Sequence, residues 1–161
     1  MAGTGFWAKC LNEAGIQTIP YDLHTTRKHN TYGHSARHMT IKRGNALKTV
    51  NDMQRRNLPG NVMISWPPYK ETTAGAVVEL LPIGARIVYI GEGGGGMTGD
   101  LYLHQFLRKN CQELAVVDLP NFTGKHDYLT IYQKIKNDPA DKKAKGIFMY
   151  NTYPDDEDTG E

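Results

Sequence analysis

This sequence lacks most of the features that would place it in a membrane, outside the cell or around a metal ion. Its only cysteines among 161 residues, Cys10 and Cys111, lack the spacing of metal ligands, which predicts buried free thiols in a reducing compartment. No apolar run approaches the ~20 residues of a membrane span, and charged residues interrupt the stretch where a secretory signal needs an apolar core. We therefore expect a cytoplasmic protein with no membrane partner.

Histidine is present, but not in a pattern that binds metal. Four histidines share one polar stretch with several basic residues: His24, His29, His34 and His38. Their spacing matches no structural or catalytic zinc site, so no metal is predicted. The stretch is interpreted as a long loop, either solvated or in contact with a substrate or RNA.

Positive and negative charges are unevenly distributed along the chain. The formal net charge is +2, but five acidic residues lie within positions 154–161, so the rest of the chain is more basic than this value suggests. A basic body permits a phosphate-bearing or nucleic-acid partner without requiring one. We expect one domain over residues 1–136 and a charged, partly disordered extension over residues 137–161.

The hydrophobic pattern predicts an α/β domain. Apolar residues recur at helical spacing between turn residues in four segments: 4–14, 47–57, 72–81 and 101–110. Short runs typical of strands occupy six others: 16–21, 39–42, 61–65, 85–90, 113–118 and 127–134. Helix and strand alternate until the last two strands, which a polar loop joins directly. This order predicts a mostly parallel sheet with a C-terminal antiparallel hairpin.

A tight glycine turn, Gly3-Thr4-Gly5, precedes the first expected helix. Asp22 follows seventeen residues after Gly5, at the end of a strand-like run. Glycine lets backbone N–H groups approach a ligand at a helix N-terminus, and an acid at this distance can bind the ribose of an adenosine ligand. The alternatives are an ordinary turn and a surface or capping acid.

A second glycine follows the strand expected at 39–42. Gly44-Asn45-Ala46 places a polar side chain at a strand end, where it can hydrogen-bond the edge of an adenine base. Taken alone, this sequence is equally consistent with a simple turn.

The segment Ser65-Trp66-Pro67-Pro68-Tyr69 follows the apolar strand expected at 61–65. Two consecutive prolines hold the backbone extended and rigid. Trp66 and Tyr69 would then lie at the carboxyl end of the sheet, where they could stack on a planar substrate. The alternative is a rigid loop with packed aromatic rings.

Glu92 begins a glycine-rich segment, 91–100, after the strongest expected strand. It is a candidate for acid–base chemistry or for positioning a substrate. The segment itself is interpreted as a ligand-binding loop, a mobile lid or a flexible connection.

Taken in order, these motifs resemble a class I S-adenosylmethionine-dependent methyltransferase. The resemblance covers nearly all of residues 2–135 and implies a Rossmann-like sheet with S-adenosylmethionine as cofactor. It implies that Gly3 and Gly5, with Thr4 between them, contact the methionine part of the cofactor. It further implies that Asp22 binds the ribose and that Asn45 and Ala46 lie beside the adenine.

Residues 67–69 resemble the catalytic loop of the amino-methylating members. In those proteins a polar residue directly before the two prolines, with a backbone carbonyl, holds the target nitrogen, and the aromatic residue stacks on its ring. Here Trp66 occupies the polar position, and Ser65 lies one residue earlier.

The family also has a first strand, ending in an acidic residue, directly before the glycine turn. We expect this strand to be missing here or supplied otherwise, by a longer chain, by the chain's own tail or by another chain, and we expect a homo-oligomer as one form. Two functions follow: methyl transfer to an aromatic or nucleic-acid acceptor, or a non-catalytic binding or structural module of the same shape. A nicotinamide-dependent oxidoreductase is a weaker alternative, because no third glycine follows Gly5 until Gly15.

Overall fold

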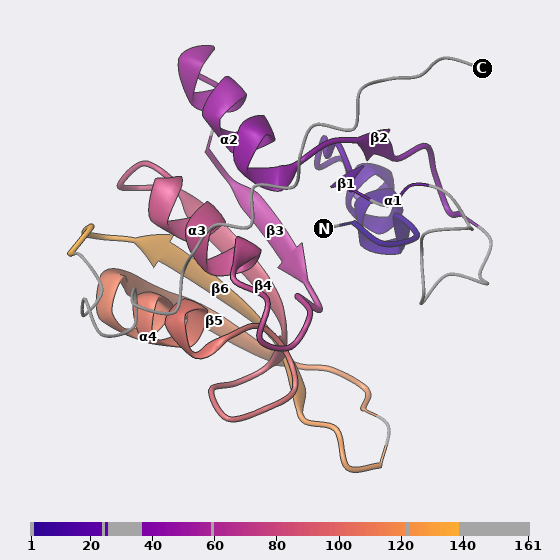
Figure 1. Cartoon of the computed structure of the whole chain (residues 1–161). Coiled ribbons are helices and arrows are strands. Elements are labelled where there is room, and N and C mark those ends of the chain that lie inside the picture. Colours follow the sequence, from indigo (N-terminus) through magenta and orange to yellow (C-terminus); the bar gives the residue numbers. More distant parts are fainter. Residues whose placement is uncertain (1, 24, 26–36, 59, 122, 139–161) are drawn as a thin grey trace.

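The computed structural model describes residues 2–23, 25, 37–58, 60–121 and 123–138 as a mixed α/β fold (Figure 1). The helices of this part of the chain are α1 (Phe6–Glu13), α2 (Ala46–Arg55), α3 (Thr73–Leu80) and α4 (Leu101–Asn110). The strands are β1 (Tyr21–Asp22), β2 (Lys42–Arg43), β3 (Val62–Ser65), β4 (Arg86–Glu92), β5 (Cys111–Asp118) and β6 (Asp127–Lys134). Each element overlaps the segment in which the sequence predicts it. None of these helices is long and apolar enough to cross a membrane.

Over the described residues the strands form two separate sheets. β1 and β2 pair in parallel, with Tyr21 opposite Lys42. The larger sheet has the order β3-β4-β6-β5; β3 and β4 are parallel, whereas β6 is antiparallel to both β4 and β5. The C-terminal hairpin is therefore confirmed, but the larger sheet is mixed rather than mostly parallel. β1 and β2 pair over only two residues each, and Pro20 lacks the N–H that would extend β1.

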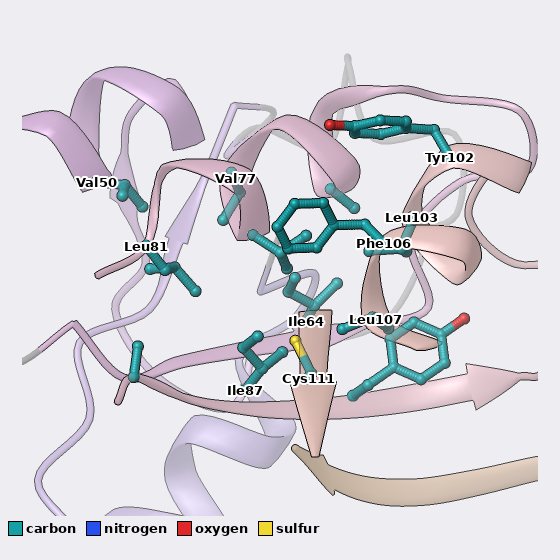
Figure 2. Packing of buried hydrophobic residues seen from close by; sticks show 14 residues of the cluster. Val50, Ile64, Val77, Leu81, Ile87, Tyr102, Leu103, Phe106, Leu107 and Cys111 are labelled. Atoms are coloured by element: carbon teal, nitrogen blue, oxygen red, sulfur yellow. The ribbon is translucent and has the colours of Figure 1, made fainter. Parts of the chain in front are cut away.

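Helices α2, α3 and α4 cover one face of the larger sheet (Figure 1). The buried apolar residues of α4 lie on one side of the helix: Tyr102, Leu103, Phe106 and Leu107. Asp100 begins this helix by accepting a 2.9 Å hydrogen bond from the N–H of Leu103. Figure 2 shows Phe106 directed into the space between helices and strands, with Ile64 of β3 and Ile87 of β4 in the same cluster. This packing fixes β3 and β4 against the helices.

A buried positive charge, the ammonium group of Lys134 in β6, lies within this packing. Lys134 is 1% exposed. Its Nζ donates to the carbonyls of Glu79 and Leu81 at 2.6 Å and of Val78 at 3.1 Å, and lies 5.2 Å from the centre of the Phe106 ring. The last carbonyls of a helix have no partner inside it, so Lys134 completes the end of α3. Burial lowers the pKa of this ammonium group.

The chain beyond β6 turns back toward the end of α4. The N–H of Ile135 donates to the carbonyl of Asn110 at 2.9 Å, and the N–H of Asp138 donates to the Asn110 side chain at 2.7 Å. The rest of the expected C-terminal extension, residues 139–161, lies outside the described residues.

Replacing Lys134 by methionine tests the role of its ammonium group. Methionine keeps the side-chain length but removes the three donors, so we expect a loss of about 1–3 kcal/mol in the free energy of unfolding. Urea denaturation measures this loss. The matched control is Lys136→Met, because Lys136 lies two residues farther along and its exposed side chain forms an ion pair with Asp138. An equal effect of both variants would contradict the assignment.

Candidate functional site

The residues that the sequence singles out lie at the carboxyl ends of two parallel strand pairs. The first set, which we call the turn cluster, comprises Gly3–Gly5, Asp22 and Gly44–Ala46 at the ends of β1 and β2. The second set lies at the ends of β3 and β4. It comprises Ser65–Tyr69, which we call the aromatic loop, and Glu92. The two sets belong to different sheets, and no strand among the described residues connects them.

Asp22 holds the glycine turn of the turn cluster in place. One of its carboxylate oxygens, Oδ2, accepts hydrogen bonds from the N–H groups of Ala2 at 3.0 Å and Gly3 at 2.9 Å. Gly3 and Gly5 both have positive φ, 54° and 80°. A Cβ at Gly5 would lie 2.9 Å from the Met39 side chain, whereas a Cβ at Gly3 would meet no described residue within 4 Å. Gly5 is therefore required by packing, whereas no described residue crowds Gly3.

The end of β2 lies beside the same acid. The N–H of Gly44 donates to the main-chain carbonyl of Asp22 at 3.1 Å. Asn45 is the N-cap of α2, and its Oδ1 accepts from the N–H groups of Leu47 and Lys48 at 3.0 and 3.2 Å. The sequence analysis left a simple turn open at this position; in the structure Asn45 caps the helix, and Ala46 begins it. The N–H of His38 donates to the carbonyl of Thr4 at 2.9 Å, which joins His38 to the turn cluster.

The aromatic loop is held by backbone hydrogen bonds and is locally strained. Trp66 has φ of 49°, in the left-handed region that is unfavourable for a residue with a Cβ. Its N–H donates to the carbonyl of Ile90 at 2.8 Å, which continues the β3–β4 ladder. Gly99 then fixes the rest of the loop, since its N–H donates to Pro67 at 2.8 Å and its carbonyl accepts from Lys70 at 2.9 Å.

This loop presents two aromatic rings to solvent. Trp66 is 46% exposed and Tyr69 is 49% exposed, whereas Pro67 is fully buried and Ser65 is half-buried. The alternative interpretation of this segment, a loop with packed aromatic rings, therefore does not match the structure. Lys70, which the sequence did not single out, also has positive φ, and its ammonium lies 5.0 Å from the centre of the Tyr69 ring.

Glu92 is buried, at 6% exposure, and binds the backbone. Its carboxylate accepts from the N–H of Met97 at 2.6 Å and from the N–H of His126 at 3.4 Å. The hydrogen bond from Met97, and after it that from His126, keeps the pKa of Glu92 below its usual range. A Cβ at Gly96 would lie 2.3 Å from the Cβ of Glu92, so this position requires glycine. Glu92 thus orders the glycine-rich segment as an ionised acceptor.

A pair of buried hydroxyl groups beside Glu92 was not predicted from the sequence. Tyr89 and Thr98 share a 2.7 Å hydrogen bond between their hydroxyls, and Thr98 also accepts from the Glu92 N–H at 2.9 Å. Burial raises the pKa of Tyr89 to about 12, so this hydroxyl stays protonated. The alternation along β4, which directs Tyr89 to the helix-covered face, is the only sequence signal for this pair.

Asp127 is a second acid that the sequence reasoning missed. It lies opposite Glu92 in the β4–β6 ladder and is buried. Its Oδ1 has no hydrogen-bond partner among the described residues. Burial, and then the charge of Glu92, raise the pKa of the Asp127 carboxyl group. Antiparallel register decides this pairing, and register is set by the whole hairpin rather than by a local motif.

The histidine-containing polar stretch lies mostly outside the described residues, and with it His24, His29 and His34. Its fourth histidine, His38, packs its ring edge-on against Phe6. Within the described ranges, no group of acidic, histidine or cysteine side chains is placed to hold a metal ion. No protein-family model matches this chain, and no curated protein matches it.

Replacing Glu92 by glutamine tests its role in ordering the glycine-rich segment. A carboxylate with a lowered pKa stabilises the folded loop above its unfolded pKa of 4.5, and this contribution is lost as the pH falls through the lower folded value. We expect the NMR signal of the Met97 amide to follow this acidic titration in the native chain. It should not do so in Glu92→Gln, while Glu113→Gln on exposed β5 should behave as the native chain. Persistence of the titration in Glu92→Gln would contradict the assignment.

Proposed function

We propose that this chain binds S-adenosylmethionine and transfers its methyl group to an aromatic or nucleic-acid acceptor. The observation that carries the proposal is the turn cluster. Gly3, Asp22 and Gly44 are joined by hydrogen bonds at the carboxyl ends of two parallel strands, and no described residue crowds Gly3. α/β proteins bind nucleotide-like ligands at such ends, with a carboxylate available to ribose hydroxyls.

The strand arrangement supports a Rossmann-like interpretation. The chain passes from β1 to its parallel neighbour β2, and then from β3 to its parallel neighbour β4 in a second sheet. Ligands in open α/β sheets bind where the strand order changes direction. The turn cluster lies at the end of one parallel pair and the aromatic loop at the end of the other.

In this proposal the chain's own residues bind and orient. The turn cluster would hold the cofactor, with the Asp22 carboxylate on its ribose and Asn45 and Ala46 near its adenine. The rings of Trp66 and Tyr69 would stack on the acceptor, and the Ser65 hydroxyl could hydrogen-bond its reacting atom. When bound, the cofactor would supply an activated methyl group, so these residues would contribute positioning more than a strong base. The proton displaced from the methylated acceptor would leave to solvent.

A second candidate function is a non-catalytic module of the same shape. The observation that favours it is the engagement of Asp22: its Oδ2 already accepts the N–H groups of Ala2 and Gly3. A ribose would have to compete with these donors. In this case the aromatic loop would bind a partner without any methyl transfer.

Calorimetry with S-adenosylmethionine and S-adenosylhomocysteine tests cofactor binding. We expect binding of both ligands by the native chain and at least about tenfold weaker binding by Asp22→Asn, which loses the charged acceptor for the ribose. Asparagine keeps an oxygen for the glycine turn, so the fold should persist. Asp52→Asn, in the C-terminal half of α2, is the control and should bind as the native chain. No heat from the native chain at millimolar ligand would favour the non-catalytic module.

Tryptophan fluorescence tests the acceptor platform. The chain has two tryptophans, so Trp7→Phe leaves Trp66 as the only emitter. We expect single-stranded oligonucleotides or small planar aromatics to quench Trp66, and Tyr69→Ala to weaken that binding by about tenfold through the loss of one stacked ring. Tyr69→Phe keeps the ring and should bind normally. Quenching that is indifferent to both Tyr69 variants would contradict a stacking platform.

A further inference from the structure

An open groove lies between the C-terminal end of α2 and the segment that connects α3 to β4. Its volume is about 560 Å³, and its lining residues come from both sides: Gln54, Asn57, Leu58, Leu80 and Pro82. The length of α2 separates this groove from the turn cluster, which lies at the start of that helix. The proposed function does not use the groove.

The ends of two helices build the groove. The Gln54 side-chain amide donates to the carbonyl of Leu80, which joins α2 to the end of α3. Asn57, with a φ of 51°, turns the chain out of α2. The N–H of Leu58 then donates back to the carbonyl of Met53 at 3.0 Å. Hydrogen bonds therefore hold both walls.

The groove exposes apolar side chains that no described residue covers. Leu58 and Leu80 are 48% and 36% exposed. Pro82, and Ile83 directly beside it, are exposed as well. An exposed apolar patch with polar residues at its border is typical of a binding surface.

Basic side chains border the groove on the α2 side. Arg55 and Arg56 are exposed at the end of α2 and directly precede the lining residue Asn57. Arg55 lies 3.7 Å from the Asp52 carboxylate, and an exposed ion pair of this kind contributes little. A ligand that fits this surface therefore combines apolar side chains with negative charge.

The last described residues of the chain lie close to the same groove. The Lys134 ammonium donates to the carbonyl of Leu81, between two lining residues, at 2.6 Å, and the Lys134 carbonyl accepts the N–H of Gly84 at 2.8 Å. Asp138 follows four residues later. Eight residues separate Asp138 from Ile147, and an extended segment of this length spans up to about 26–29 Å. Residue 147 can therefore reach the groove.

We propose that the apolar run Ile147-Phe148-Met149-Tyr150 docks in this groove, with the acidic residues of positions 155–161 against Arg55 and Arg56. We call residues 147–150 the docking segment. Between positions 139 and 161 they are the only run of consecutive apolar residues, and five acidic residues follow them. An apolar run followed by acidic residues matches an apolar groove with a basic border.

Attachment to the same chain favours this occupant. A short tether gives the docking segment an effective concentration on the order of millimolar, so a modest apolar contact is sufficient for docking. The inference concerns a surface away from the candidate site, and it holds whether or not the chain binds S-adenosylmethionine.

Paramagnetic broadening of NMR signals tests docking in the full chain. A nitroxide is attached at Asn151→Cys, directly after the docking segment, in a chain that also carries Cys10→Ser; the other cysteine is buried. We expect the methyl signals of Leu58 and Leu80 to broaden relative to the same chain with a reduced nitroxide. Those of Leu101 should stay sharp, because α4 begins after the carboxyl end of β4 and the groove lies near its amino end.

Matched variants assign the contact to particular side chains, with the Leu58 signal as the readout. Phe148→Ser should lower the ratio of docked to free segment by at least about tenfold, because a large apolar side chain is lost. Tyr153→Ser, outside the docking segment, should not. In the groove, Leu80→Ser should act as Phe148→Ser does, whereas Ile83→Ser beside it should behave as the native chain.

The charged part of the contact has its own test. Replacing Arg55 and Arg56 together by glutamine should lower the docked-to-free ratio by about two- to fivefold, as expected for exposed ion pairs. Lys48→Gln, exposed near the start of α2, is the control. An unchanged ratio in the double variant would contradict the contact between the acidic residues and α2.

Three results would overturn docking itself. The signals of Leu58 and Leu101 could broaden equally, which would show no preferred position. The broadening could persist in Phe148→Ser. It could also appear in isotope-labelled chains without a nitroxide when they are mixed with unlabelled chains that carry one, which would assign the groove to the docking segment of a second copy.

Discussion

The ammonium group of Lys134 joins the helices to the sheet. Three carbonyls at the end of α3 and the face of Phe106 surround it, so one side chain of β6 holds both α3 and α4. An unpaired charge at this depth would be strongly unfavourable, and the carbonyls that surround it would otherwise have no partner inside the helix. The position of α3 matters for the site, because the aromatic loop leads directly into this helix. Lys134 fixes one end of α3 and the Gly99 hydrogen bonds fix the loop before the other.

Local patterns in the sequence were sufficient to predict the helices and the longer strands. Helical spacing predicted α4 at its observed bounds, and alternation predicted β6 with the same accuracy. The short strands β1 and β2 were placed less well, because two paired residues leave almost no periodic signal. The share of antiparallel pairing in the larger sheet was underestimated for a different reason. Which strand lies next to β4 depends on how the C-terminal hairpin folds back, and no local motif encodes that choice.

The candidate site residues were predictable where the backbone conformation requires a particular residue type. The glycines of the turn cluster and the two prolines of the aromatic loop meet such a requirement, and they mark strand ends. The surrounding groups were not predictable. Asp127 meets Glu92 only through antiparallel register, and Thr98 reaches Tyr89 only because the glycine-rich segment folds back over β4. Lys134 resembled any other lysine in an alternating strand until α3 was packed against it.

The geometry of Ala2 bears on how the proposed cofactor would reach Asp22. The Ala2 N–H is shared between the Tyr21 carbonyl and the Asp22 carboxylate, at 3.1 and 3.0 Å. A divided hydrogen bond is weaker toward each acceptor. In the proposed function a ribose hydroxyl would take the place of this N–H on the carboxylate, while the N–H would stay bonded to Tyr21. The glycine turn would therefore remain attached to β1 while the Asp22 carboxylate changes its partner.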